Sequence, residues 1–292
     1  MERVKTPDQF WGQERFGKNV EIRAIFMRHG PKAEIRDITT QSLISEEGKK
    51  KVREVGKKRE VQRHGIKAYT SPVERAIETA ELILEEQEKK GAKIFKTRKR
   101  TELGMWSSSK KFTQRFAEMI KENLPPNFEE LEGDAKQEAL DKTEDKILDW
   151  WLGFKDQRPD ETTPPPREIA AGVAKLVDRY INMADRLYSG SEIELLNTSH
   201  KGIPESLLKE VLLRKVKGEN NEEKIIRGFE SLQDIGGSMR PSESWSLIIK
   251  TDDGGNKTIK ILLRGQEYDL DTDRLNELVE LWDISKNQTP SA

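Results

Sequence analysis

Short apolar runs alternate with charged, helix-spaced stretches over the first hundred residues of the chain. Residues 21–27, 66–70 and 93–96 have the length and composition of buried strands. Between them lie a charged stretch that opens at Ser45 and an apolar-spaced stretch closed by Gly91, and both patterns indicate helices. Alternating strands and helices predict an α/β domain whose parallel strands are joined by right-handed crossovers.

The middle of the chain interrupts this alternation. The pattern from Ser107 to Gly153 is helical and acidic, and a turn-rich stretch rich in proline follows it. We therefore expect a helical cap inserted at about residues 107–165. Further expected elements are a helix at about 167–188, a strand at 192–198, a helix near Pro204, a hairpin at 245–265 and a closing helix at 271–282. The pattern predicts a single domain over residues 1–292, a three-layer α/β sandwich with a mostly parallel central sheet and this cap.

Composition and charge restrict the cellular compartments and the classes of partner that fit this chain. The 292 residues carry 52 Lys and Arg against 53 Asp and Glu, so the net charge is −1 and no overall field favours nucleic acid or a membrane surface. The chain has no cysteine, which excludes disulfides, thiolate metal sites and cysteine nucleophiles. No apolar run has the length of a signal peptide or a membrane span. We therefore expect a cytoplasmic protein that binds neither nucleic acid nor membranes.

Only three histidines, at positions 29, 64 and 200, are available for imidazole chemistry. His29 follows the carboxyl end of the first apolar strand, where open α/β sheets place their ligand sites. His64 lies at the predicted end of a charged helix, where Gly65 suits a C-cap and His64 suits the helix dipole. We therefore expect a structural role for His64, whereas for His29 the alternative to chemistry is a simple turn after a strand.

Two further residues indicate an anion site. Arg75 lies in the first turn of the helix that follows Ser71, where a cation is electrostatically misplaced unless it binds a phosphate together with the free amides of the helix. His200 ends the strand at 192–198 and is expected at the same sheet edge as His29. The alternatives are a solvated surface arginine and a core histidine.

Several separated segments match one family in order and rough spacing: MRHG, SEEGKKKVREVG, AYTSPVERAIETA, TELGMW and NTSHKG. Over about residues 21–106 and 192–250 the chain resembles the histidine phosphatase superfamily, with its phosphoglycerate mutase-like fold. The resemblance implies that His29 is the phosphorylated nucleophile, that Glu102 is the proton donor and that a protonated His200 stabilises the transferring phosphoryl group. It also implies a phosphate pocket lined by Arg28, Arg75 and His200, with Ser71 as a weaker contact. This chemistry requires no metal and no cofactor.

Departures from the family pattern favour a phosphatase of the first branch. Mutases carry RHGxSxxN, whereas Pro31 and Lys32 follow Gly30 here, and the His-Asp pair of the acid phosphatase branch is replaced by His200-Lys201. Lys32 and Lys201 either add positive charge at the mouth of the pocket or are solvated. Trp106, Trp150 and Trp151 either line the cleft or pack at helix ends. The next candidates for the acid are Glu34 and Glu205, because each lies within a few residues of a motif histidine.

The sequence therefore predicts a metal-independent phosphomonoesterase that forms a phosphohistidine and acts on a small-molecule or protein phosphate ester. A non-catalytic phospho-ligand-binding or scaffold protein is one alternative, and a phosphoglycerate-type mutase is another. The identity of the substrate and the oligomeric state stay open at this stage, because the predicted cap carries no recognisable motif.

Overall fold

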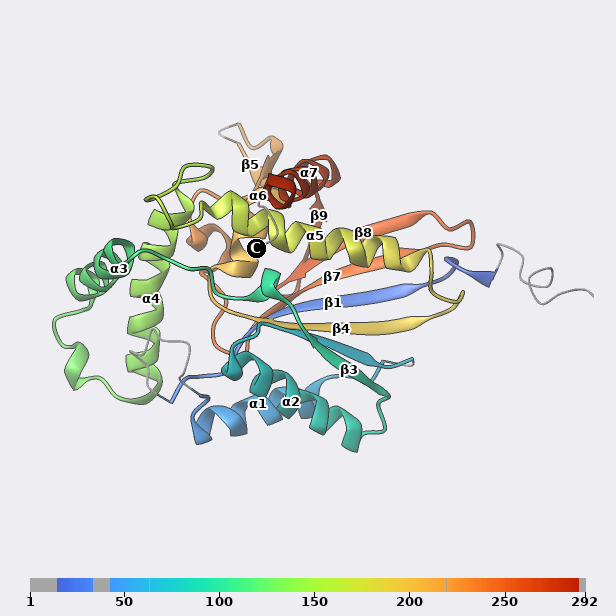
Figure 1. Ribbon diagram of the computed structural model, residues 1–292, viewed down its shortest axis with the longest axis horizontal. Coiled ribbons are helices and arrows are strands. Elements are labelled where there is room, and N and C mark those ends of the chain that lie inside the picture. Colours follow the sequence, from blue (N-terminus) through green and yellow to red (C-terminus); the bar gives the residue numbers. More distant parts are fainter. Residues whose placement is uncertain (1–14, 34–42, 63, 219, 289–292) are drawn as a thin grey trace, which may run out of the picture.

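The computed structural model describes residues 15–33, 43–62, 64–218 and 220–288. Within these ranges the chain forms one nine-stranded sheet and seven α-helices. Figure 1 shows α1 and α2 on one face of the sheet and α5, α6 and α7 on the other, which confirms the predicted α/β class. The strands are β1 (Glu21–Arg28), β2 (Ile66–Thr70), β3 (Ile94–Lys99), β4 (Glu192–Ser199), β5 (Leu212–Lys217), β6 (Glu223–Arg227), β7 (Ser244–Thr251), β8 (Lys257–Leu263) and β9 (Gln266–Leu270). The helices are α1 (Glu46–Lys58), α2 (Glu74–Lys89), α3 (Lys110–Asn123), α4 (Gly133–Leu152), α5 (Pro166–Ala184), α6 (Ile203–Val211) and α7 (Thr272–Gln288), with 3₁₀ turns η3 (Thr101–Leu103), η4 (Phe128–Glu130) and η5 (Leu232–Ile235).

The sheet is mixed, and its strand order is β3-β2-β4-β1-β7-β8-β9-β5-β6. The pairs β2–β3, β2–β4 and β1–β4 are parallel. The pairs β1–β7, β7–β8, β8–β9, β5–β9 and β5–β6 are antiparallel. The prediction of a mostly parallel sheet is therefore wrong. The error arises because the sequence pattern did not reveal β5, β6 and β9. The charged sequences of β6 and β9 lack the apolar pattern of a buried strand, and β5 follows α6 without a turn.

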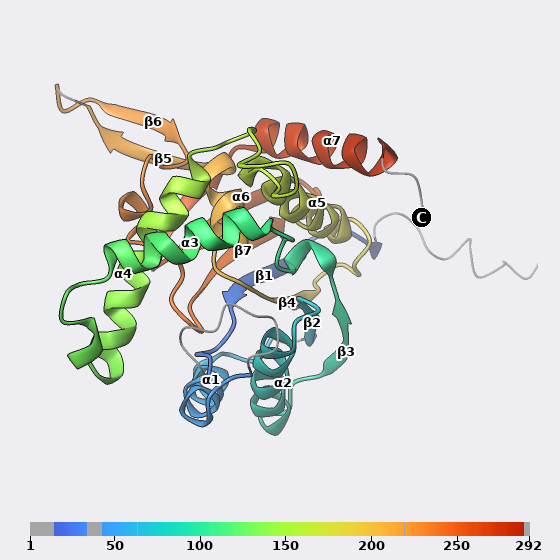
Figure 2. The same ribbon diagram turned by 60° about the vertical axis from the view of Figure 1, so that its left-hand side comes forward.

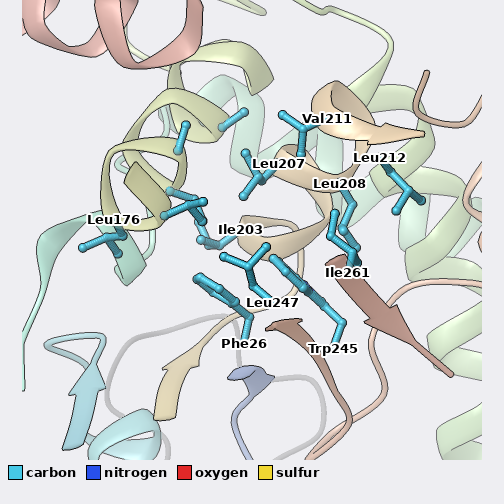
Figure 3. Packing of buried hydrophobic residues seen from close by; sticks show 14 of the residues in the cluster. Phe26, Leu176, Ile203, Leu207, Leu208, Val211, Leu212, Trp245, Leu247 and Ile261 are labelled. Carbon is cyan, nitrogen blue, oxygen red and sulfur yellow. The ribbon is translucent and has the colours of Figure 1, made fainter. Parts of the chain in front are cut away.

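The parallel strands β1, β2 and β4 are largely buried, as their near-continuous apolar runs require, whereas the parallel edge strand β3 is mostly exposed. Along β1, Ile22 and Phe26 face the core under α5 and α6, whereas Met27 belongs to the core under α1 and α2. The ring of Phe26 stacks on Trp245 of β7 with centroids 4.4 Å apart. Figure 3 shows this pair beneath Ile203 and neighbouring side chains of α6. The packing fixes the ends of the central strands, where the candidate site lies.

Residues 104–165 leave the sheet after η3 and form α3, η4 and α4 before α5 begins. Figure 1 shows α3 and α4 beyond the end of the sheet at which β1 and β4 finish, and Figure 2 shows the same two helices in front of that end. Leu148 and Trp151 of α4 belong to the same apolar core as Phe26. The indole of Trp106 stacks on that of Trp151 with centroids 4.4 Å apart and 6° between the planes. The inserted helices are thus packed onto the body through shared apolar side chains.

No helix in the described part of the chain has both the length and the apolar content that crossing a membrane requires. Helix α1 ends at Lys58, earlier than the predicted end near His64.

Candidate functional site

The carboxyl ends of β1, β2 and β4 lie side by side and bring the predicted residues together. Arg28 ends β1, His29 follows it, and His200 follows β4. With Arg75 from the first turn of α2, these side chains line one pocket of about 210 Å³. Ser71 lies behind this lining, hydrogen-bonded to His200. The structure therefore assembles four of the predicted side chains around one cavity and the fifth next to them.

The hydrogen bonds of His29 fix its tautomer. Its Nδ1 lies 2.7 Å from the carbonyl oxygen of Gly30, which only accepts, so Nδ1 carries the proton. Its Nε2 accepts a hydrogen bond from Nε of Arg75 at 3.0 Å. Burial lowers the pKa of His29 well below 6.5, and the nearby His200, Arg28 and Arg75 lower it further. The ring is therefore neutral, and its Nε2 lone pair is directed toward Arg75.

His200 is neutral as well. Arg75 places Nη2 3.4 Å from Nδ1 of His200, and a guanidinium only donates, so Nδ1 accepts and Nε2 carries the proton. Nε2 then donates to Oγ of Ser71 at 2.8 Å. Burial lowers the pKa of His200 well below 6.5, with Arg75, Arg28 and Lys32 lowering it further. In the ligand-free site, burial and the neighbouring cations both disfavour a charged ring. The expectation of a protonated His200 concerns the phosphate-bound site and stays a prediction.

Arg28 connects the pocket to the inserted helices. Its Nη1 donates to Oδ1 of Asp141 and to the carbonyl oxygen of Met239, both at 3.0 Å. Its Nη2 lies 3.6 Å from a carboxylate oxygen of Glu144. Asp141 and Glu144 both belong to α4, so this helix orients one of the two arginines of the pocket.

Lys201 is surrounded by carboxylates of the same helix. Its Nζ lies 3.2 Å from Asp141, 2.9 Å from Glu144 and 3.2 Å from Asp145. Burial acts to raise the pKa of Glu144, but Lys201 and Arg28 together lower it below its ordinary value. Glu144 also lines the pocket beside His29 and Arg28. The predicted positive charge of Lys201 at the mouth is therefore neutralised by α4.

Glu102 is not part of this group. Its Oε1 accepts from Nη1 of Arg179 on α5 at 2.9 Å, and its side chain does not line the pocket. The short turn η3 directs it toward α5, so the ligand-free site does not bring Glu102 to the pocket, and its role as proton donor stays a prediction. Glu205 is buried at the start of α6, where it accepts from the backbone N–H groups of Gly202 and Met239. Glu34 lies outside the described residues.

The pocket carboxylate that sequence reasoning missed is Glu144. Glu144 and Asp145 lie three and four positions after Asp141, which places the three carboxylates on one face of a helix. This spacing is the one signal in the sequence that could have pointed to Glu144. Nothing in the sequence connects that face with Arg28, because Asp141 lies 113 residues farther along the chain.

His64 lies away from the pocket. It is exposed, and its Nδ1 accepts from the backbone N–H of Glu192 at 3.0 Å, at the opposite end of β4 from His200. Its expected place at a helix end is wrong because α1 stops earlier, and Arg63 lies outside the described residues. Among the three tryptophans, Trp106 and Trp151 line the pocket, whereas Trp150 packs against Phe112.

A comparison with protein families matches residues 24–119 to the histidine phosphatase superfamily (branch 1). The predicted histidine phosphatase resemblance is confirmed. The matched segment contains Arg28, His29, Ser71, Arg75 and Glu102, and His200 lies beyond it. A match over this segment suggests phosphate ester hydrolysis or mutase activity.

Solved structures that are similar to this chain include a phosphoglycerate mutase and several phosphatases. A phosphoglycerate mutase from Bacillus anthracis shares 15% identity over 90% of this chain and 98% of its own, with a TM-score of 0.49. A mycobacterial glucosyl-3-phosphoglycerate phosphatase shares 15% over 86% and 97%, with a TM-score of 0.46. A phosphoserine phosphatase from Entamoeba histolytica shares 13% over 84% and 98%, with a TM-score of 0.45. No curated protein sequence matches the chain.

Proposed function

We propose that this protein is a metal-independent phosphomonoesterase that works through a phosphohistidine on His29. The observation that carries the proposal is the state of His29: a neutral ring whose unprotonated Nε2 faces a pocket lined by Arg28, Arg75 and His200. A neutral imidazole nitrogen with a directed lone pair is a nucleophile, and arginines stabilise the charge on the oxygens of a transferring phosphoryl group.

The first step joins Nε2 of His29 to phosphorus and breaks the ester P–O bond. In the ligand-free site Nε of Arg75 donates a hydrogen bond to Nε2 of His29. A bound phosphate must therefore accept the hydrogen bond of Arg75 before Nε2 can attack phosphorus. The guanidinium then binds phosphate oxygens in place of the ring nitrogen, which releases the lone pair when substrate is present. The departing alkoxide takes a proton and leaves as the alcohol. In the second step the oxygen of a water molecule joins phosphorus and gives up a proton, the P–Nε2 bond breaks, and inorganic phosphate leaves with His29 restored.

We assign the proton transfers to Glu144. Within the described ranges it is the acidic side chain that lines the pocket with His29, and Glu102 is held by Arg179. Its pKa is lowered in the ligand-free site by Lys201 and Arg28. A dianionic phosphate bound at Arg28 shields that cation and adds negative charge nearby, so it raises the pKa of Glu144 toward the value that a general acid needs.

The test is a brief incubation with a ³²P-labelled phosphomonoester followed by an alkaline quench, because phosphohistidine survives base and is destroyed by acid. We expect base-stable, acid-labile label on His29 in the wild-type protein and neither label nor phosphate release in His29→Ala. His64→Ala is the matched control and should retain both. Equal losses in the two variants would contradict the assignment of the nucleophile.

The same assay separates the alternatives. A phospho-ligand-binding protein without catalysis would bind vanadate or tungstate but form no label. A mutase would return the label to a second substrate position faster than it releases inorganic phosphate. We expect release to dominate and EDTA to leave it unchanged.

A further inference from the structure

We propose that the substrate is a phosphomonoester whose organic group is apolar, either alkyl or aryl. It is neither a sugar phosphate nor an ester that carries a second acidic group. This inference rests on the proposed function for the identity of the phosphate end. It concerns the other half of the same pocket, which the histidines and arginines do not line.

Beyond the phosphate end, apolar side chains make most of the pocket wall. Met105 and Trp106 come from the segment after η3, Phe112 and Phe116 from α3, and Leu148 from α4. Binding sites for polyols carry several fixed polar groups that hydrogen-bond the ligand hydroxyls, whereas an apolar wall gains free energy by removing apolar ligand surface from water. The composition of this wall favours the second kind of ligand.

The polar side chains of this half are already engaged. Ser108 and Thr113 supply its hydroxyls, and their Oγ atoms lie 3.1 Å apart. Thr113 donates to the carbonyl oxygen of Ser109 at 3.0 Å, so its hydrogen is used within α3 and its oxygen is left to accept from Ser108. Among the described residues, a sugar would meet few unused donors in this half of the pocket, so hydroxyls that it buried there would be left unpaired.

Charge argues against a second anionic group on the substrate. Glu144 lines the pocket, and in the ligand-free site it is a carboxylate with a lowered pKa that repels an entering acidic group. Once the bound phosphate has raised that pKa, a second acidic group beside Glu144 would compete for its proton. Lys201, the cation next to it, is already neutralised by Asp141, Glu144 and Asp145. Lys32 also lines the pocket, but near His200 at the phosphate end. The side of the pocket that Glu144 lines therefore disfavours phosphoglycerates and bisphosphates.

The apolar wall is held in place. Trp106 stacks in parallel on Trp151, whose side chain is buried, and its outer edge lies against Gly202. A Cβ at Gly202 would lie 3.1 Å from that indole and 3.2 Å from Leu148, so the three residues pack closely. A preformed wall binds an apolar group without a large ordering cost.

The test compares hydrolysis of n-alkyl phosphates from butyl to octyl with that of glycerol 3-phosphate and 3-phosphoglycerate by the wild-type protein. Burying methylenes should raise kcat/KM about two- to four-fold for each added carbon. The two polar substrates should lie at least about ten-fold below butyl phosphate, since their polar groups lose hydrogen bonds to water.

Phe116→Ala should flatten this chain-length dependence, because it removes part of the wall and touches none of the residues at the phosphate end. Phe95→Ala is the matched control: Phe95 is 37% exposed on β3 and does not line the pocket. The control should keep the wild-type slope.

A second measurement keeps this inference separate from the proposed function. Binding of n-alkylphosphonates, which are not hydrolysed, is followed by calorimetry with the wild-type protein and should strengthen with chain length. Hydrolysis without any chain-length dependence, or with a preference for the polar substrates, would overturn the apolar substrate and leave the phosphatase standing. Chain-length-dependent phosphonate binding without label or phosphate release would instead sustain the apolar ligand and overturn the phosphatase.

Discussion

At the residue scale, the site depends on two histidines that burial keeps uncharged. His29 and His200 are each 4% exposed, and Arg28 and Arg75 lie against them. A protonated imidazole would lose water and meet positive charge at the same time, so both effects lower the pKa in the same direction. The arrangement keeps Nε2 of His29 unprotonated at neutral pH, and Nδ1 of the same ring is held by a backbone carbonyl.

This charge state predicts how stability depends on pH. The folded protein keeps both rings neutral, whereas the unfolded chain binds a proton at each once the pH falls below about 6.5, so acid favours unfolding. The free energy of unfolding should therefore fall between about pH 7 and pH 5, by at most about 1.4 kcal/mol per pH unit for each histidine. Urea unfolding at several pH values measures this slope.

The matched variants are His200→Gln and His64→Ala. The first removes one of the two buried rings and should reduce the slope, whereas the second removes an exposed ring and should leave it unchanged. A slope that is the same in all three proteins would show that other groups cause the acid sensitivity.

The proton donor gives a second prediction at this scale. Glu144→Gln should slow phosphorylation by an alkyl phosphate by about 10²–10⁴-fold, because an alkoxide cannot leave unprotonated, and should affect nitrophenyl phosphate far less. Glu102→Gln should remain within a few-fold of the wild-type rate, since Glu102 contacts Arg179. Burst kinetics with both esters measure the phosphorylation step. The reverse result, with Glu102→Gln impaired, would restore Glu102 as the acid.

At the element scale, α4 is the inserted helix that determines the electrostatics of the pocket. One face of the helix carries Asp141, Glu144 and Asp145 toward Arg28 and Lys201 and, in its last turns, Leu148 and Trp151 into the core. Asp145 also accepts from the backbone N–H and the hydroxyl of Ser238. A single helix thus orients a phosphate-binding arginine and builds part of the apolar wall.

The junction between β4 and α6 provides a test of how closely this helix and Trp106 are packed. Gly202 has a φ of +93°, and an alanine there would be strained and would press on Trp106 and Leu148. Gly190→Ala is the control, since Gly190 has a φ of +78° but nothing within 4 Å of an added Cβ. Both variants should lose about 1 kcal/mol for the left-handed backbone, and Gly202→Ala should lose more.

Thermal unfolding and tryptophan fluorescence measure the two parts of this prediction. The fluorescence of the folded protein should change in Gly202→Ala and stay unchanged in Gly190→Ala. If the two variants lose the same stability with identical spectra, the contact between Gly202 and Trp106 is looser than the structure indicates.

At the scale of the whole molecule, the inserted helices and the α/β body share one core. Phe112, Leu148 and Trp151 belong to the same apolar cluster as Phe26 of β1 and Tyr180 of α5. Separating the two parts would expose these side chains to water, at about 1.5–3 kcal/mol for each large apolar side chain. The helices therefore do not behave as a freely opening lid.

Hydrogen exchange followed by mass spectrometry checks this cooperativity. The slowly exchanging amides of α4, β1 and β4 should all exchange with the same free energy of opening under native conditions, because global unfolding is the common route by which they reach solvent. The amides near the hairpin of β5 and β6 serve as the reference for local opening. Exchange of α4 at a clearly lower free energy than β1 would show that the inserted helices open independently.

Much of the site was predictable because its residues follow apolar runs. The strand before His29, the strand before Ser71 and the strand before His200 are each recognisable, and parallel neighbours bring their ends together. The helix start at Arg75 was predictable from the turn before it. These inferences need only the periodicity of neighbouring residues.

The remaining features depend on contacts between distant segments. The direction of Glu102 is set by η3 and by Arg179, 77 residues farther along the chain. The position of Glu144 depends on how α4 packs against the sheet end, which no local pattern encodes. The antiparallel strands β6 and β9 escape detection because charged residues dominate strands that are largely exposed.

The two outer strands of the mixed sheet, β3 and β6, have a consequence for self-association. Each leaves one row of backbone N–H and C=O groups without a neighbouring strand, which is the usual template for edge-to-edge aggregation. β3 carries three basic residues and no acidic one in the sequence IFKTRK, whereas β6, with the sequence EKIIR, carries two basic residues and one glutamate. A second copy aligning its own β3 edge would bring like charges together, so part of the high charge content of this chain protects that edge of the sheet from being extended.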